Sequence, residues 1–178
     1  MLDKRETRNA VRRALAQIEP AQRQTRSERI CARVEALECV READTVALFA
    51  SLPDEPQSAA LLRRLAAAGR KVVVPRVEGC VMEFYAYRPE AMARGAFGID
   101  EPQQGEPVRP ADIDVMILPG VAFTAAGARL GRGKGFYDRY MSREGFRARR
   151  IGVCFAEQIV AQLPSEPHDM AVDEVIFG

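Results

Sequence analysis

The spacing of hydrophobic positions changes once along the chain, near position 44. Before it, apolar residues such as Val11, Leu15 and Ile18 recur every three or four positions, which is the spacing of one face of an amphipathic helix. This part of the chain predicts two helices, at residues 3–18 and 20–40. After it, short continuous apolar runs alternate with helical segments, a pattern typical of parallel strands that are buried on both faces.

The alternating part of the chain predicts a three-layer α/β/α fold around a mostly parallel sheet. We expect strands at residues 45–50, 71–74, 81–87, 114–118, 151–155 and 174–177, with 81–87 as a short edge strand. Helices are expected at 58–68, 136–144 and 157–163, with one or two helical turns at 89–94. The polar stretch at 101–110 predicts a connecting loop, so residues 1–178 should form a single domain.

Composition narrows the classes of protein that the chain can belong to. A chain of 178 residues with 47% hydrophobic residues can build a substantial core. Its net charge of +1 provides no basic field for nucleic acid, and its apolar runs fall short of the roughly 18 residues that span a bilayer. The four cysteines form no CxxC pair, which argues against a zinc site or a disulfide framework. We therefore expect a soluble, cytoplasmic monomer with no nucleic-acid or membrane partner.

Glycine and basic residues are concentrated just after the apolar run that ends at Leu118. Residues 118–140 hold five of the 13 glycines, interleaved with Arg129, Arg132 and Lys134. Glycines between a strand and a helix let successive backbone N–H groups point at one anion, and the helix N-terminus adds its positive dipole end. The stretch matches neither the P-loop nor the dinucleotide fingerprint. It predicts a phosphate cradle, with a flexible basic surface turn as the alternative.

Three loops should meet at one edge of the predicted sheet. Ligands of such sheets bind beyond the carboxyl ends of the strands, and the loops at 51–57, 75–80 and 119–135 each follow a predicted strand. At 100° per residue, Lys4 and Arg8 project within about 60° of the apolar face of the first helix. We expect these two cations to point into a cleft, whereas Arg12 and Arg13 should lie on the solvated face.

Seven motifs in order resemble the 5-formyltetrahydrofolate cyclo-ligase family, also called methenyltetrahydrofolate synthetases. The similarity covers nearly the whole chain, with the family's order and spacing. The motifs are Lys4 with Arg8, SLPDE at 51–55, VVVPR at 72–76, Met82 with Phe84 and Tyr85, FGIDEP at 97–102, PGVAF followed by RLGRGKGFYDRY at 119–140, and HDMAVDEV at 168–175.

The resemblance implies an enzyme that uses ATP and Mg²⁺ to convert 5-formyltetrahydrofolate, with or without a polyglutamate tail, to 5,10-methenyltetrahydrofolate. It implies phosphorylation of the formyl oxygen, attack by N10, and release of ADP and phosphate. It also implies a fold similar to that of the sugar-phosphate isomerases and CoA transferases. Two other functions stay open: a non-catalytic formyl-folate binding protein, and an isomerase-like enzyme of related fold.

The resemblance also assigns residues to roles. It implies catalysis by Lys134 and Arg132, and a metal held by Asp138 and Asp173. The residues implied for ATP are Lys4, Arg5, Arg8, Arg129, Gly131, Arg132, Gly133, Lys134, Gly135, Phe136 and Tyr137. The residues implied for the folate substrate are Ala50, Glu55, Met82, Phe84, Gly133, Lys134, Gly135 and Phe136.

Each carboxylate also has a simpler explanation. Glu55 could be a solvated loop carboxylate, Asp138 could complement the helix dipole, and Asp173 could be a boundary residue. A carboxylate at Glu55 suits a pterin, whose paired N–H donors match a bidentate acceptor.

Other positions are equally open or depart from the family. Met82 and Phe84 could be core residues, and His168, the single histidine, is expected to be structural. The chain departs from the family at Phe136, where a tyrosine is common, and at Thr124, where an aspartate is usual.

Overall fold

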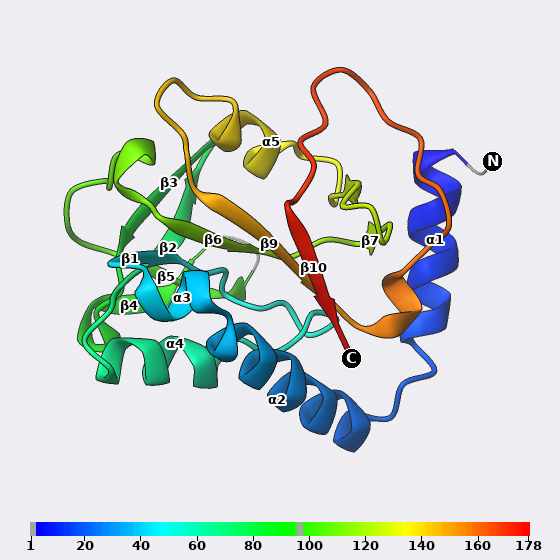
Figure 1. The fold of residues 1–178 in the computed structure, drawn as a ribbon, viewed down its shortest axis with the longest axis horizontal. Coiled ribbons are helices and arrows are strands. Elements are labelled where there is room, and N and C mark those ends of the chain that lie inside the picture. The colour runs from blue at the N-terminus through cyan, green and yellow to red at the C-terminus, as the bar shows by residue number, and fades with distance from the viewer. Residues whose placement is uncertain (1–2, 96–97) are drawn as a thin grey trace.

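The computed structural model describes residues 3–95 and 98–178. Six of its strands form one sheet: β1 (Thr45–Ala47), β2 (Lys71–Glu78), β3 (Val81–Ala86), β6 (Val115–Leu118), β9 (Arg149–Cys154) and β10 (Glu174–Phe177). Their spatial order is β10-β9-β6-β1-β2-β3 (Figure 1). All neighbours in this sheet are parallel except β3, which runs antiparallel to β2 at one edge. The predicted α/β fold with a mostly parallel sheet is confirmed.

Helices cover both faces of the sheet. They are α1 (Lys4–Leu15), α2 (Pro20–Ala36), α3 (Glu38–Glu42), α4 (Ala59–Ala67) and α5 (Phe136–Met141). In Figure 1, α2 and α4 lie below the sheet and α5 above it, while α1 stands at the right-hand side near the C-terminal segment. A capping box between Asp3 and Glu6 starts α1, which fixes where Lys4 and Arg8 leave the helix.

Burial on both faces explains the continuous apolar runs. Along β6, Val115 and Ile117 belong to the core that contains α1, α2 and α4 side chains. The alternate residues Met116 and Leu118 belong to the second core, with Tyr140 of α5. Because successive strand residues point to opposite faces, every position of β6 must be apolar.

Several predicted elements are shorter or differ in type. The helix expected at 20–40 is interrupted at Leu37, whose backbone is extended, so that α2 and α3 are separate helices. The helix expected at 157–163 is a single 3-10 turn, η4 (Ala156–Gln158). Its Gln158 side chain is buried and bonds to the backbone of Phe155 and Gly120, a tertiary contact that hydrophobic spacing does not reveal.

The connections contain structure that the sequence pattern did not predict. Residues 89–94 form a 3-10 turn, η1 (Pro89–Ala91), and a strand, β4 (Met92–Arg94). This strand pairs with β5 (Asp100–Pro102) inside the stretch expected to be a loop, which also holds η3 (Pro110–Asp112). A second small hairpin pairs β7 (Ala122–Phe123) with β8 (Arg129–Leu130), and it places Arg129 beneath the glycine loop.

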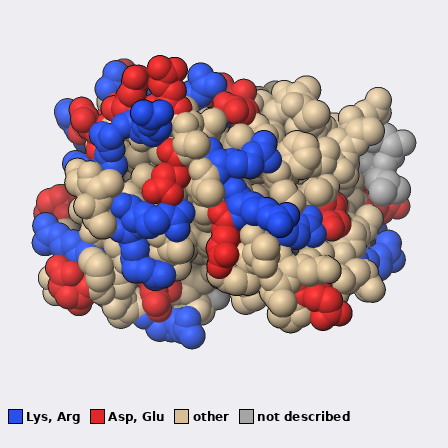
Figure 2. Space-filling view, turned by 60° about the horizontal axis from the view of Figure 1, so that its bottom comes forward, with Lys and Arg blue, Asp and Glu red and all other residues tan. Residues whose placement is uncertain are grey.

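The surface carries charges of both signs. Figure 2 shows one face, on which Lys and Arg side chains are interspersed with Asp and Glu. This mixture agrees with the net charge of +1. Within the described residues, no helix combines the length and the hydrophobicity needed to cross a bilayer.

Phe123 is held between two glycines beside the site. A Cβ on Gly152 would lie 2.6 Å from Phe123 Cε1, and a Cβ on Gly120 would lie 2.6 Å from Phe123 Cζ. The Phe123 ring is fully buried, so it has little room to move away. Close packing of this ring therefore depends on both glycines.

We predict that Gly152→Ala lowers the free energy of unfolding by about 1–3 kcal/mol, because the added methyl overpacks the core. Urea unfolding measures the loss. The double variant Gly152→Ala/Phe123→Leu should lose less than the sum of the two single variants, since the smaller side chain makes room. Additive losses would show that the Phe123 contact does not require the glycine.

Candidate active site

A pocket of about 250 Å³ opens at the carboxyl ends of β1, β2 and β6. The loops that follow β1 and β6 form part of its wall, as expected for the carboxyl ends of parallel strands, whereas most of the loop expected at 75–80 is strand, because β2 extends to Glu78. Glu55 and Ala50 come from the first loop, Pro75 and Val77 from β2, and the glycine loop supplies much of the rest. Met82 of β3 also lines the pocket, whereas Phe84, expected to contact folate, is buried in the core against Tyr140, 4.8 Å between ring centroids.

The glycine loop needs its glycines for backbone conformation and for close packing. Gly133 and Gly135 have φ of 100° and 65°, values that side chains disfavour. Arg8 Nε donates to the Gly131 carbonyl oxygen at 2.9 Å, and the Arg8 guanidinium lies 3.6 Å from where a Cβ on Gly133 would be. Arg8 therefore joins α1 to this loop, while Arg5, which the resemblance assigns to ATP, is exposed to solvent.

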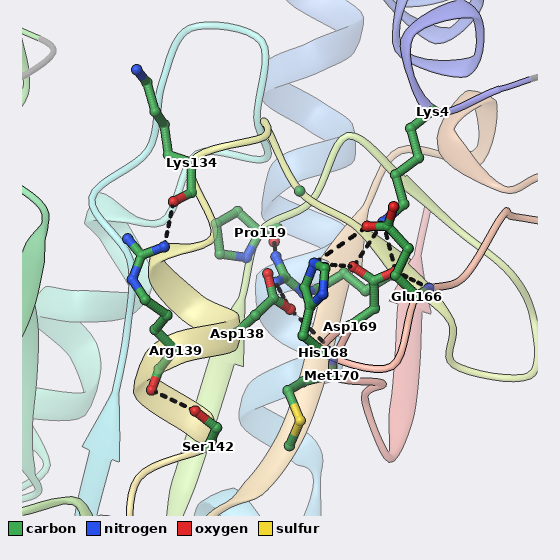
Figure 3. A network of polar contacts seen from close by, with 12 residues as sticks. Lys4, Pro119, Lys134, Asp138, Arg139, Ser142, Glu166, His168, Asp169 and Met170 are labelled. Carbon is green, nitrogen blue, oxygen red and sulfur yellow. Dashed lines mark hydrogen bonds and ion pairs between the residues drawn. The ribbon is translucent and has the colours of Figure 1, made fainter.

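Lys134 projects from the tip of this loop. It is exposed and makes no ion pair within residues 3–95 and 98–178. Figure 3 shows its ammonium pointing away from the carboxylates of Asp138 and Asp169, although its backbone is part of the pocket wall. The following helix α5 has only six residues, so its dipole adds less positive potential than the sequence suggested. Most of the positive charge around the glycine loop therefore comes from Lys and Arg side chains.

Arg129 and Asp138 form a buried ion pair under the loop. Arg129 Nη2 lies 2.9 Å from Asp138 Oδ1, with side chains that are 2% and 15% exposed. Arg129 Nη1 also donates to the Pro119 carbonyl oxygen. A Cβ on Gly120 or on Gly131 would lie 3.3 Å from the Arg129 side chain. Arg129, expected to contact ATP, holds Asp138 in this structure.

The segment at 166–170 brings further carboxylates to Asp138. Asp138 Oδ1 accepts a hydrogen bond from the Met170 backbone N–H at 3.1 Å. The adjacent Asp169 and Glu166 both bind the Lys4 ammonium, at 2.7 and 2.6 Å (Figure 3). Burial lowers the pKa of Lys4, but the hydrogen bonds to Asp169 and Glu166 outweigh it and raise the pKa. Lys4 is thus committed to carboxylates in this structure.

Asp173 lies elsewhere. Its carboxylate accepts hydrogen bonds from the backbone and the guanidinium of Arg150. This contact lies at the start of β9, whereas parallel sheets bind ligands at the opposite ends of their strands. The hydrogen bond from Arg150 lowers the pKa of Asp173. The structure therefore corrects the expected pairing of Asp173 with Asp138: Asp169, four positions earlier in the same motif, lies beside Asp138.

Three side chains of this segment form a cluster of metal-ligand type. One ligand atom each of Glu166, His168 and Asp169 lies within 4.8 Å of the others. Asp169 was not expected in the site, because the motif at 168–175 holds two aspartates and only their position in the fold distinguishes them, and Glu166 lies outside the motif. Ile99 and Glu101, which line the pocket from the β5 side, were also not expected there.

Glu55 is a buried carboxylate, contrary to the solvated alternative. It is 4% exposed; Oε2 accepts from the Leu52 N–H at 2.9 Å, and Oε1 accepts from Arg132 at 2.9 Å. Burial raises the pKa of Glu55, and the Leu52 and Arg132 contacts oppose that rise. Arg132, which also binds Asp54, is paired with acids and does not point freely into the cradle.

The chain is similar to known proteins over its full length. A family model described as the 5-formyltetrahydrofolate cyclo-ligase family matches residues 1–178. The 5-formyltetrahydrofolate cyclo-ligase of Escherichia coli K12 is 32% identical, covering 93% of each chain. That of Mycolicibacterium smegmatis is 34% identical, covering 74% of this chain and 72% of the relative.

Solved structures agree with this similarity. The NMR structure of Aquifex aeolicus 5,10-methenyltetrahydrofolate synthetase matches with a TM-score of 0.88 and 32% identity, over 98% of this chain and 89% of the other. A 5,10-methenyltetrahydrofolate synthetase from Mycoplasma pneumoniae has a TM-score of 0.80 at 22% identity, covering 98% of each chain. The second match supports the fold alone.

We predict that Arg129→Met lowers the free energy of unfolding by about 3 kcal/mol or more, because it leaves Asp138 buried without its counter-charge. Thermal or urea unfolding measures this loss. The matched control is Arg109→Met, which removes an exposed ion pair with Asp112 and should leave stability unchanged. Equal effects of the two substitutions would contradict a special role for the buried pair.

Proposed function

The chain belongs to the 5-formyltetrahydrofolate cyclo-ligase family, and from this premise we propose that it uses MgATP to close 5-formyltetrahydrofolate to 5,10-methenyltetrahydrofolate. One observation carries the proposal: the glycine loop and the buried carboxylate of Glu55 line the same pocket. A phosphate donor on the loop and a pterin against Glu55 would then lie within reach of one another. The pocket would therefore bind both substrates side by side.

The chemistry explains why a phosphate donor is needed. The formyl oxygen of an amide-like group is a poor leaving group. Transfer of the γ-phosphoryl group to this oxygen forms an O–P bond and releases ADP. N10 then attacks the formyl carbon, and the C–O bond breaks with its electron pair going to the phosphate oxygen. The proton lost from N10 is balanced by release of the phosphate as hydrogen phosphate.

Positioning and charge stabilisation are the tasks left to the protein, as is general for phosphoryl transfer. Lys134 extends from the loop without a carboxylate partner among the described residues, so its ammonium is available to neutralise transferring phosphate. The N–H groups of the loop would bind phosphate oxygens. Arg8, bonded to the Gly131 carbonyl, keeps the loop in place and adds positive charge at its edge.

The acidic groups beside Asp138 fit Mg²⁺. This ion prefers oxygen ligands and is usually held by one or two carboxylates together with substrate phosphates. Asp138 uses only Oδ1 in its bonds to described residues, which leaves Oδ2 for a metal. Asp169 and Glu166 would be the nearest further ligands, and Lys4 would turn from them to phosphate. When bound, Mg²⁺ would offset the negative charge of the phosphates.

Glu55 would orient the folate. A carboxylate accepts the paired N–H donors of a pterin, and the burial of Glu55 strengthens such hydrogen bonds by excluding water. In this structure Arg132 occupies Oε1 of Glu55. The substrate must therefore share this oxygen with Arg132 or displace it, and Asp54 is positioned to retain the released guanidinium.

Enzyme mixed with 5-formyltetrahydrofolate and MgATP should develop the absorbance of the methenyl product, with none when ATP is omitted. Lys134→Met should lower kcat by about 100-fold or more through loss of charge stabilisation, with an unchanged circular dichroism spectrum. Lys71→Met, at the exposed start of β2, is the matched control and should keep full activity. Wild-type enzyme that binds folate without turnover would overturn the proposed function, and a fully active Lys134→Met would remove this lysine from the mechanism.

The metal assignment predicts a contrast between two nearby aspartates. Asp169→Asn should raise the Mg²⁺ concentration needed for half-maximal rate several-fold at fixed ATP, because an amide is a weaker ligand than a carboxylate. Asp173→Asn should leave this concentration unchanged, since Asp173 is bonded to Arg150. A Mg²⁺ titration of both variants checks the contrast, and the reverse result would return the metal to Asp173.

A further inference from the structure

Tyr137 occupies a fixed position in the pocket wall. It is the second residue of α5, and it lines the pocket together with Glu55 and Lys134. The Arg129 guanidinium carbon lies 5.5 Å from the centre of the Tyr137 ring. Because Arg129 is itself held by Asp138 and the Pro119 carbonyl, the ring has a rigid support on one face.

Tyr137 is half-buried, and its hydroxyl lacks the hydrogen-bond partner that the hydroxyls of the buried Tyr85 and Tyr140 have. No described residue forms a hydrogen bond with it, whereas Tyr140 donates to the Val108 carbonyl and Tyr85 accepts from Arg76. Because Tyr137 lines the pocket, its hydroxyl donor is left available to a ligand bound there.

A tyrosine hydroxyl is protonated at neutral pH, so Tyr137 can donate a hydrogen bond. Glu55 lines the same pocket, and the Arg129 guanidinium lies over the Tyr137 ring. Glu55 belongs to the proposed folate side of the pocket, and Arg129 holds Asp138 on the proposed metal side. A neutral hydrogen-bond donor near both sides of the pocket suits the phosphoryl group that is transferred from ATP to the folate.

We propose that the Tyr137 hydroxyl donates a hydrogen bond to the former formyl oxygen while its bond to carbon breaks. The inference rests on the proposed function and deepens it. In this step N10 forms its bond to the formyl carbon, the C–O bond breaks, and the electron pair goes to the oxygen that leaves with phosphate. Tyr137 keeps its proton throughout and acts by stabilising the charge that develops on the oxygen. Tyr137 would therefore contact the transferred oxygen. This contact is distinct from the ATP contact that the family resemblance implies.

Tyr137→Phe tests the proposal, with Tyr140→Phe as the matched control because Tyr140 donates to Val108 outside the pocket. Loss of one such donor should lower kcat about 100-fold without raising KM for folate or for ATP, because only a step after phosphoryl transfer is slowed. In a single-turnover experiment, ADP should form at the wild-type rate while the methenyl absorbance lags behind it. Tyr140→Phe should show no lag and a nearly normal kcat, and Tyr137→Phe should keep the wild-type melting temperature.

The outcomes separate this inference from the proposed function. If wild-type enzyme forms no ADP with 5-formyltetrahydrofolate, the proposed function fails and the role of Tyr137 fails with it. If the wild type is active and Tyr137→Phe has a normal kcat, only the inference is overturned. A raised KM for ATP, or ADP formation that slows in step with the methenyl product, would make Tyr137 a nucleotide contact and would also overturn it.

Discussion

The buried ion pair between Arg129 and Asp138 connects the parts from which the site is built. Arg129 comes from the small β7–β8 hairpin, Asp138 from α5, and each also bonds to a backbone group elsewhere, at Pro119 and Met170. Two glycines, Gly120 and Gly131, leave the room that the Arg129 side chain occupies. Because an unpaired charge at this depth would be costly, the pair constrains the loop, the helix and the C-terminal segment to one arrangement.

The other carboxylates described for the site are also paired with cations in this structure. Lys4 neutralises Asp169 and Glu166, and Arg132 neutralises Glu55. MgATP and folate would exchange these partners: metal for the Lys4 ammonium, phosphate for the carboxylates, and pterin donors for the Arg132 guanidinium. Such exchange lets highly charged ligands enter without leaving a charge unpaired, so the cost of desolvation is limited.

Hydrophobic spacing was sufficient to predict the sheet, since β6 is apolar at every position and β1 is buried throughout, with Thr45 as its one polar residue. It also located the pocket, because loops after parallel strands share one edge. It could not identify the partners of the charged residues. Arg129 and Asp138 are nine positions apart, and only the β7–β8 hairpin turns Arg129 under the loop. Asp169 and Asp173 share one motif, and the path of the chain past Met170 decides which of them reaches Asp138.

The proposed function requires that phosphate is transferred to the formyl oxygen before N10 closes the ring. Its most direct test is to supply 5-formyltetrahydrofolate labelled with heavy oxygen at the formyl position, together with unlabelled MgATP, and to analyse the released phosphate by mass spectrometry. We predict one heavy oxygen in the inorganic phosphate for each methenyl product formed. Unlabelled phosphate, with the heavy oxygen found in water, would contradict the account.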